Sequence, residues 1–273
     1  MNQEDNTATS DTIEDFIFLN RDRVFNLLFE AGEVIMEFYN KISLSDIKYK
    51  SDNSPVTEAD LASNRIISKG LTESFPSIAL ISEESEIQGY HIRKNFEYIW
   101  LIDPLDGTKE FINKTDEFTI NVALVYKKRA IAGFIYIPVQ KKLYYAFKGK
   151  GAFELTDTGP VKIHCSKFSL LQEGLRVVIS RSHMDKFTRE EIQRLKNPKK
   201  ITLGSALKFI SIAKGESDYY PRMIHIMEWD TAAGQIIIEE AGGYFEDALT
   251  GKPLEYNKPS LINPYFIATG SYK

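Results

Sequence analysis

The chain has 273 residues, of which 43% are hydrophobic and 26% charged, and its formal net charge is -4 at pH 7. This is the composition of a folded globular protein, long enough for one large domain or two closely joined ones. The small negative charge excludes the general basic surface that is typical of nucleic-acid-binding proteins, so we expect no nucleic-acid partner.

Three features bear on the compartment. A single cysteine, Cys165, excludes internal disulfides and fits a reducing environment. The polar, acidic N-terminus lacks the basic and apolar segments of a signal peptide. No apolar run approaches the roughly 18 residues that a membrane-spanning helix needs. We therefore expect a cytoplasmic protein with no transmembrane segment.

The chain is expected to begin with a flexible tail, residues 1–10, followed by one long amphipathic helix. Asp11 and Glu14 have the spacing of a capping box, in which an N-terminal side chain and an acid three residues later satisfy the free amides of a helix start. From there, apolar side chains recur at helical spacing as far as Phe38.

A second helix is predicted to start after Thr57, its expected N-cap, with Asp60 in its first turn. The ordinary explanation for Asp60 is this cap. A short strand at 79–82 then leads directly into Glu83, whose ordinary explanation is a solvated surface position.

Residues 99–111 read Ile-Trp-Leu-Ile-Asp-Pro-Leu-Asp-Gly-Thr-Lys-Glu-Phe. The first four predict a buried strand, and Pro104 is expected to end it, because proline removes a backbone donor and restricts the residue before it. Asp106-Gly107 is a strong turn signal. Asp103 and Asp106 are thus expected on a tight loop. They either shape the turn or supply the hard oxygen ligands that suit Mg²⁺.

After this loop, short turns are expected to join strands at 118–126, 130–137 and 142–147. The segment from 149 to 160 is rich in turn residues and is interpreted as the seam between an N-terminal α+β half, 11–155, and a C-terminal α/β half, 156–273. Strands in the second half are predicted at 161–164, 175–181, 200–203, 217–220, 244–246 and 265–269, with helices near 185–196, 205–214 and 228–241. Because strands and helices come in runs, the order favours α+β layers.

Acidic side chains recur at the ends of these elements. They are Asp60, Glu83, Asp103, Asp106 and Asp230. If they converge, their repulsion is severe, since two unit charges about 4 Å apart interact by about 4 kcal/mol even at an effective dielectric of about 20. Such a cluster persists only with cations. Two Mg²⁺ ions roughly 3.5–4 Å apart would neutralise it and form a two-metal phosphoryl-transfer site.

Four motifs occur in a fixed order along the chain. They are Ser-Pro-Val-Thr-Glu-Ala-Asp (54–60), Ser-Glu-Glu-Ser (82–85), Trp-Leu-Ile-Asp-Pro-Leu-Asp-Gly-Thr-Lys-Glu-Phe (100–111) and Trp-Asp-Thr-Ala-Ala-Gly (229–234). From about residue 12 to 269, their order and spacing resemble the inositol monophosphatase superfamily. The resemblance implies a layered αβαβα sandwich of the sugar-phosphatase type and an Mg²⁺-dependent phosphatase that lithium inhibits.

Finer features resemble one branch, the bacterial CysQ-type 3'(2'),5'-bisphosphate nucleotidases. They are Lys-Glu-Phe (109–111), Ile-Ser-Arg-Ser-His (179–183), Gly-Ser-Ala-Leu-Lys-Phe (204–209) and Tyr-Pro-Arg (220–222). The branch removes the 3'-phosphate of adenosine 3',5'-bisphosphate (PAP), leaving AMP, and acts in sulfur metabolism. The resemblance leaves open the sulfated form PAPS as a substrate and a peripheral position on the cytoplasmic face of the inner membrane.

The resemblance also implies a role for each acid. The metal ligands would be Glu83, Asp103 and the Leu105 carbonyl for a first Mg²⁺, and Asp103, Asp106 and Asp230 for a second, with a third ion left open. Thr108, paired with Asp60, would orient and deprotonate the attacking water alongside Glu83. Metal-acidified water removes the need for a serine or cysteine nucleophile.

The substrate-binding residues implied by the resemblance fall into two groups. The amides of Gly107 and Thr108 would bind the scissile phosphate, with Asp230 nearby. The second phosphate would lie among His183, Ser205, Lys208 and Arg222. Taken alone, these have ordinary alternatives: a turn residue for His183, a solvated helix position for Lys208 and a surface ion pair for Arg222.

The chain departs from the branch pattern at two places. Ala206 stands where the branch often has a second serine, and residues 223–228 match no motif of the branch. Two other functions stay open. One is an inositol monophosphatase or fructose bisphosphatase, against which Lys208 and Arg222 argue. The other is a non-catalytic PAP sensor, which would not need Thr108 and Asp60. The sequence gives no oligomeric state.

Overall fold

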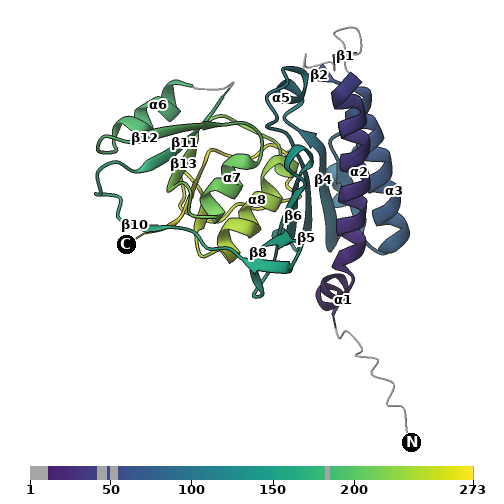
Figure 1. The fold of residues 1–273 in the computed structure, drawn as a ribbon. Helices are drawn as coiled ribbons and strands as arrows, with labels where there is room; N and C mark the ends of the chain where they lie inside the picture. The colour runs from purple at the N-terminus through teal and green to yellow at the C-terminus, as the bar shows by residue number, and fades with distance from the viewer. Residues whose placement is uncertain (1–11, 42–47, 50–54, 182–184, 273) are drawn as a thin grey trace, which may run out of the picture.

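The computed structural model describes residues 12–41, 48–49, 55–181 and 185–272. In these ranges helices and sheets alternate in five layers, so the expected α+β fold with αβαβα layering is confirmed (Figure 1). The predicted tail at 1–10 lies outside the described residues.

The outer helical layer contains α1 (Ile13–Leu19), α2 (Arg21–Lys41) and α3 (Glu58–Ser74). The prediction of one continuous first helix is wrong, because α1 ends at Asn20, whose side-chain amide donates to the Phe16 carbonyl at 2.8 Å. The N-cap of α1 is Thr12, whose hydroxyl accepts from the Asp15 amide at 3.1 Å. The expected cap, Asp11, lies outside the described residues.

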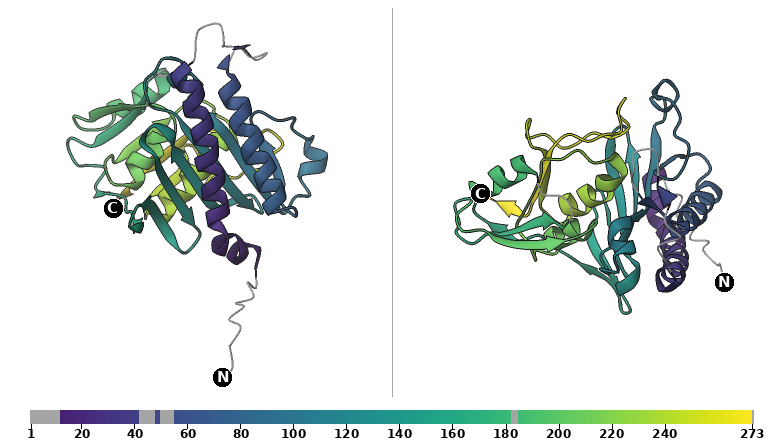
Figure 2. Two further views of the ribbon diagram at one scale, coloured as in Figure 1. Left: turned by 45° about the vertical axis from the view of Figure 1, so that its right-hand side comes forward. Right: turned by 90° about the horizontal axis from the view of Figure 1, so that it is seen from above.

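The first sheet has seven strands in chain order. They are β3 (Ala79–Ser82), β4 (Tyr98–Asp106), β5 (Thr119–Tyr126), β6 (Arg129–Ile137), β7 (Lys142–Phe147), β8 (Gly151–Thr156) and β9 (Gly159–Lys162). Within the described residues of this sheet, β3 and β4 pair in parallel, and the other neighbouring strands pair antiparallel. Helices α2 and α3 cover one face and α8 the other (Figure 2). Because both faces are covered, β5 is buried from Thr119 to Val125 and is almost continuously apolar.

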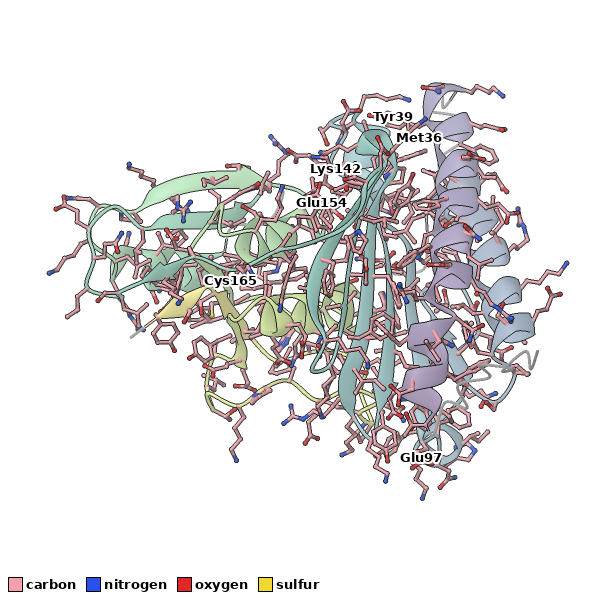
Figure 3. The ribbon with its side chains drawn as sticks, turned by 60° about the horizontal axis from the view of Figure 1, so that its bottom comes forward. Met36, Tyr39, Glu97, Lys142, Glu154 and Cys165 are labelled. Carbon is pink, nitrogen blue, oxygen red and sulfur yellow. The ribbon has the colours of Figure 1, made fainter. Side chains whose placement is uncertain are left out.

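The segment expected to be the seam between two halves contains β8 and the start of β9. Strands β7 and β8 pair as a hairpin, along which Lys142 forms an ion pair with Glu154 at 3.7 Å (Figure 3). The first sheet therefore continues to Lys162, beyond the predicted boundary at residue 155. The division into two halves stays a prediction.

The second sheet has the strand order β12 (Lys199–Leu203), β11 (Arg176–Ser180), β13 (Tyr219–Arg222), β15 (Phe266–Thr269) and β14 (Tyr244–Asp247). Its inner face packs on α7 (Leu207–Ala213) and α8 (Glu228–Glu240), while α6 (Lys186–Gln193) lies outside. The remaining elements are β1 (Lys48–Tyr49), β2 (Pro55–Val56), α4 (Tyr90–Arg93), α5 (Thr108–Ile112), η2 (Pro138–Gln140), β10 (Lys167–Phe168) and β16 (Ser271–Tyr272).

The single cysteine lies in the connection between the two sheets (Figure 3). The Cys165 amide donates to the Ala241 carbonyl at 2.9 Å. Burial raises the pKa of the Cys165 thiol to about 12, so the thiol stays protonated near neutral pH. A protonated thiol is a poor nucleophile, so Cys165 is unsuited to nucleophilic catalysis.

Helix α8 lies between the two sheets, and glycines allow its close approach. A Cβ on Gly133 of β6 would lie 2.7 Å from the Ala233 carbonyl oxygen and 2.5 Å from Ile236 Cγ2. A Cβ on Gly234 would lie 2.4 Å from the Phe209 ring of α7. These contacts fix the distance of α8 from β6 and α7, and with it the place of the residues that begin the helix.

We expect Gly133→Ala to destabilise the protein, because the new methyl group meets the backbone of α8. Overpacking of this kind costs about 1–3 kcal/mol, and the melting temperature should fall by roughly 2–4 °C per kcal/mol. Thermal unfolding followed by circular dichroism measures this. Gly89→Ala is the matched control, since its new Cβ would meet only the mobile end of the His91 side chain. Equal melting temperatures for the two variants would contradict the argument.

Candidate active site

Strand β4 extends further into the motif at residues 100–111 than the sequence predicted. Pro104 does not end the strand, which continues to Asp106 through a register shift between Asp103 and Asp106. Proline is tolerated at such an irregularity because no ladder hydrogen bond from its nitrogen is needed there. The bulge holds both carboxyl groups on a paired strand, with the Leu105 amide donating to Asp103 Oδ1 at 3.1 Å.

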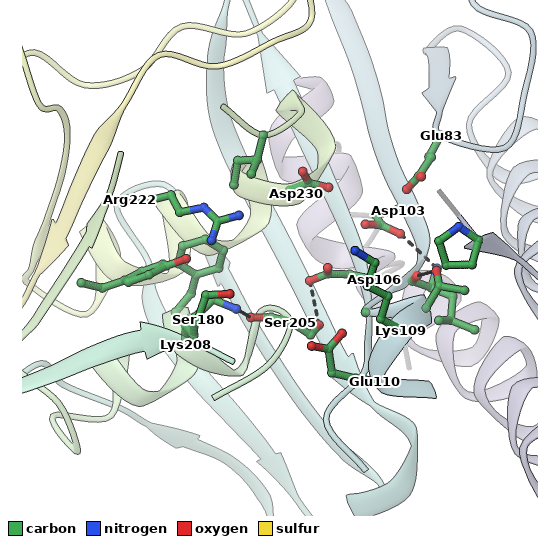
Figure 4. Close-up of a pocket in the computed structure, with 17 residues that line it drawn as sticks. Glu83, Asp103, Asp106, Lys109, Glu110, Ser180, Ser205, Lys208, Arg222 and Asp230 are labelled. Carbon is green, nitrogen blue, oxygen red and sulfur yellow. Dashed lines mark hydrogen bonds between the residues drawn. The ribbon is translucent and has the colours of Figure 1, made fainter. Parts of the chain in front are cut away.

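Three acids from three elements converge. Glu83 follows β3, Asp103 lies in β4 and Asp230 lies in the first turn of α8, and one carboxylate oxygen from each lies within 4.8 Å of the others. Parallel pairing brings the ends of β3 and β4 together, and α8 starts above this edge (Figure 4). Asp106 lines the same cavity but does not belong to this group of three.

The electrostatics of the group are unfavourable for full ionisation. Burial raises the pKa of Asp103 well above its usual value, and the charges of Glu83, Asp106 and Asp230 raise it further. Burial also raises the pKa of Asp230 to about 8, with contributions from Asp106 and Glu83. A nearby cation would reverse these shifts, because it favours the charged form of each carboxyl.

The donor set fits Mg²⁺, which takes hard oxygen ligands. Glu83, Asp103 and Asp230 supply carboxylates, and Asp106 and Leu105 line the same space. The Leu105 carbonyl also faces the Thr108 hydroxyl at 3.4 Å. The structure thus brings together all five residues for which the resemblance implies a metal-binding role.

Thr108 and Asp60 are hydrogen-bonded, as the resemblance implies. The Thr108 hydroxyl donates to Asp60 Oδ1 at 3.1 Å. The other oxygen, Oδ2, accepts from the Thr57 amide at 2.8 Å and from the Thr57 hydroxyl at 2.6 Å, so Asp60 also caps α3. Burial raises the pKa of Asp60, while these hydrogen bonds lower it.

Two buried cations face the cavity from the side of the second sheet. Arg222 is 9% exposed, and its Nε has no hydrogen-bond partner among the described residues. Lys208 is 7% exposed and donates from Nζ to the Ser205 carbonyl at 2.5 Å. Burial lowers the pKa of Lys208 to about 8, although the charge of Asp106 raises it. Neither matches its ordinary alternative, a solvated helix position or a surface ion pair.

Ser205 contacts Asp106 as well as Lys208 at the cationic end of the cavity. Its hydroxyl donates to Asp106 Oδ2 at 2.7 Å. Gly107, at φ +93°, lies so close that a Cβ on it would be 3.2 Å from Ser205 Cβ. His183, the other predicted donor, lies outside the described residues.

Several polar residues of the site were not predicted from the sequence. Asn121 donates to Asp106 Oδ2 at 3.2 Å, and Thr119 contacts both Asn121 and Ser205. A polar side chain within the otherwise apolar β5 was the signal available for Asn121. Ser180 and Glu110 also line the cavity. Both lie within motifs quoted above, but neither was predicted to have a role in the site.

The cavity that joins these groups has a volume of about 300 Å³. Its lining residues are Pro55, Glu83, Asp103, Leu105, Asp106, Gly107, Thr108, Lys109, Glu110, Ser180, Ser205, Lys208, Phe209, Tyr220, Arg222, Ile226 and Asp230. Figure 4 shows the acids on one side and Arg222 and Lys208 on the other. The site can therefore hold cations at one end and an anion at the other.

Residues 21–269 match the model of the inositol monophosphatase family. The chain belongs to this family. It is 40% identical over 250 residues to the 3'(2'),5'-bisphosphate nucleotidase CysQ of Shigella flexneri, covering 90% of this chain and 97% of that protein. Identity to the CysQ of Buchnera aphidicola is 39% over 262 residues, covering 96% of each.

Solved structures agree with this membership. The crystal structure of CysQ from Bacteroides thetaiotaomicron, described as a bacterial member of the family, matches with a TM-score of 0.80 and 34% identity, covering 93% of this chain and 98% of that one. An IMPase/NADP phosphatase complexed with Mg²⁺ and phosphate shares the fold, with a TM-score of 0.78 and 20% identity, covering 93% and 92%. Within the described part of the chain, no helix has the length and apolarity to cross a membrane.

We expect the protein stripped of metal with EDTA to lose stability as the pH rises. The pKa of Asp230 is about 8 in the fold against 3.8 for a free side chain. The unfolded chain therefore releases this proton first, and the stability present below about pH 4 is lost as the pH rises through about 8. Melting temperatures between about pH 5 and about pH 8.5 test this.

The matched control is Asp230→Asn, which should flatten the dependence on pH. Excess Mg²⁺ should raise the melting temperature of the wild type at the upper end of the range, because a ligand that binds the folded state stabilises it. Equal slopes for the wild type and the variant would contradict the assignment.

Proposed function

We propose that the protein is an Mg²⁺-dependent 3'(2'),5'-bisphosphate nucleotidase that hydrolyses PAP to AMP and phosphate. One observation carries the proposal: a single cavity has converging carboxylates at one end and the buried pair Lys208 and Arg222 at the other. A substrate with two phosphates satisfies both ends at once. The names of relatives about 40% identical to this chain support the same reaction.

The proposed metal ligands are the carboxylates of Glu83, Asp103, Asp106 and Asp230 with the Leu105 carbonyl, arranged around two Mg²⁺ ions, with a third left open. When bound, Mg²⁺ neutralises this charge and makes water more acidic. The family and the oxygen-rich cluster support Mg²⁺ itself. The number of ions is part of the proposal.

The chain's own acid–base pair is proposed to be Thr108 and Asp60. Because the Thr108 hydroxyl donates to Asp60 Oδ1, the lone pairs of its oxygen remain available to accept a proton from water. Asp60 can then take the threonine proton, and its buried position, which raises its pKa, makes it a stronger base. Glu83 is proposed to orient the same water.

The two phosphates are proposed to bind at opposite ends of the cavity. The amides of Gly107 and Thr108 hold the scissile 3'-phosphate beside Asp230, at the turn that opens α5. The phosphorus–3'-oxygen bond breaks, the attacking water supplies the new oxygen on phosphorus and gives one proton to the Thr108–Asp60 pair, and the leaving 3'-oxygen takes a proton from solvent water. Lys208 and Arg222 hold the 5'-phosphate, and we include His183 on the resemblance alone.

Two other functions fit the site less well. An inositol monophosphate would leave Lys208 and Arg222 buried without an anion, which is costly for charged groups. Fructose bisphosphate would have to place its second phosphate beside Lys208 and Arg222 without a nucleoside between its two phosphates. A PAP sensor would not require Thr108 hydrogen-bonded to Asp60. PAPS also carries the phosphates of both ends and stays a candidate substrate.

The test is phosphate release from a panel of PAP, PAPS, inositol 1-phosphate and fructose 1,6-bisphosphate. We expect PAP to give a kcat/KM well above those of inositol 1-phosphate and fructose 1,6-bisphosphate. Excess EDTA and Asp103→Asn should each abolish release, because each removes the metal site. Preference for inositol 1-phosphate, or full activity in EDTA, would refute the proposal.

We further expect Arg222→Ala to discriminate between substrates. A hydrogen bond to a charged group contributes about 1.5–3 kcal/mol, so kcat/KM for PAP should fall by about 10- to 150-fold. Hydrolysis of inositol 1-phosphate should hardly change, since it offers no second phosphate. Arg194→Ala is the matched control, since Arg194 directly follows α6 and its side chain is 75% exposed. Equal losses on both substrates would instead assign Arg222 to the metal site or the fold.

A further inference from the structure

Ser205 makes one contact toward each end of the cavity. Its hydroxyl donates to Asp106 Oδ2 at 2.7 Å, and its carbonyl accepts from Lys208 Nζ at 2.5 Å. Figure 4 draws both contacts as dashed lines. One residue therefore links the acid that faces the metal site to the ammonium group that faces the second phosphate.

The hydroxyl of Ser205 helps to fix the orientation of Asp106. Asn121 Nδ2 donates to the same oxygen, Oδ2, at 3.2 Å, and Thr119 Oγ1 lies 2.7 Å from Ser205 Oγ. With both donors on Oδ2, the other oxygen, Oδ1, has no protein donor among the described residues. Removal of the serine hydroxyl would leave Asn121 as the sole side-chain donor that the described residues offer to Asp106.

The backbone of Ser205 is held in an uncommon conformation. Its φ is +47°, in the left-handed region that residues other than glycine rarely adopt. The preceding Gly204 amide donates to Glu117 Oε2 at 2.8 Å, and Lys208 binds the carbonyl that follows. These contacts therefore hold the backbone of Ser205 in this conformation. A shift of its carbonyl would rotate the peptide and move the Ser205 side chain with it.

We propose that Ser205 is a positioning residue that couples occupancy of the second-phosphate end to Mg²⁺ affinity through Asp106. The proposal rests on the proposed function. The ammonium group of Lys208 has three protons, so a phosphate can bind it beside the Ser205 carbonyl, and the charge of the phosphate weakens the hydrogen bond to that carbonyl. The change at this carbonyl is passed to the hydroxyl, which sets the orientation of Asp106. By linkage, the factor by which the phosphate changes Mg²⁺ affinity equals the factor by which Mg²⁺ changes nucleotide affinity.

The test is calorimetric titration of Mg²⁺ into the protein with and without AMP, which carries only the 5'-phosphate, and with adenosine as the uncharged control. For the wild type we expect AMP to lower the Kd for Mg²⁺ by about 5- to 150-fold, the usual range of such coupling. In Ser205→Ala and Ser205→Gly, each measured at an AMP concentration that saturates the variant, the factor should fall toward one. Glycine adopts φ +47° freely, so Ser205→Gly removes the hydroxyl without backbone strain.

Ser211→Ala is the matched control, because Ser211 lies on α7, the helix that follows Ser205, and its hydroxyl bonds Ser217 instead of Asp106. It should keep the wild-type factor. If both Ser205 variants keep the factor, the coupling is direct attraction between phosphate and metal, and the proposal is wrong. If wild-type protein hydrolyses PAP and binds AMP in EDTA but shows no coupling, the proposal also fails while the function stands. If AMP does not bind, the proposed 5'-phosphate end fails and the coupling with it.

Discussion

The repulsion among three carboxylates at the edge of the first sheet sets the requirements for much of the surrounding structure. Glu83 and Asp103 are fixed by paired strands, whereas Asp230 stands at the start of a helix that could move away. Glu228 prevents this. It is fully buried and accepts from the Lys258 ammonium at 2.5 Å and from the Lys258 amide at 3.1 Å. This ion pair ties the first turn of α8 to the loop beyond it, which keeps the acids together against their mutual repulsion.

Opposite the acids, the cationic end of the cavity carries the positive charges of Lys208 and Arg222. Lys208 and Arg222 lie on α7 and β13, elements of the second sheet and its helical layer, so the cavity joins side chains from both sheets. Burial makes each charge costly without an anion and makes each contact with an anion stronger. In the proposed function, the same desolvation that lowers the pKa of Lys208 favours a second phosphate at this end of the cavity.

Local patterns were sufficient for most of the fold. Strands β5, β6 and β7 were predictable because each is a run of apolar residues bounded by turn formers, and the acids were visible because they stand at element ends. The features that could not be predicted depend on contacts between residues distant in sequence. Pro104 stays within β4 because β5 tolerates a register shift, and the contact of Ser205 with Asp106 requires two sheets to meet. Only the family motifs distinguished Lys208 and Arg222 from ordinary surface charges.

The order of Glu83, Asp103 and Asp230 along the chain has a consequence for biosynthesis. Glu83 and Asp103 leave the ribosome long before α8, and domains form from the N-terminus onward during synthesis. A nascent chain that ends before α8 presents these carboxylates without their third partner and without the helix that buries them. Metal loading is therefore expected to follow the synthesis of α8, and a translation product that lacks α8 cannot assemble the three-acid group.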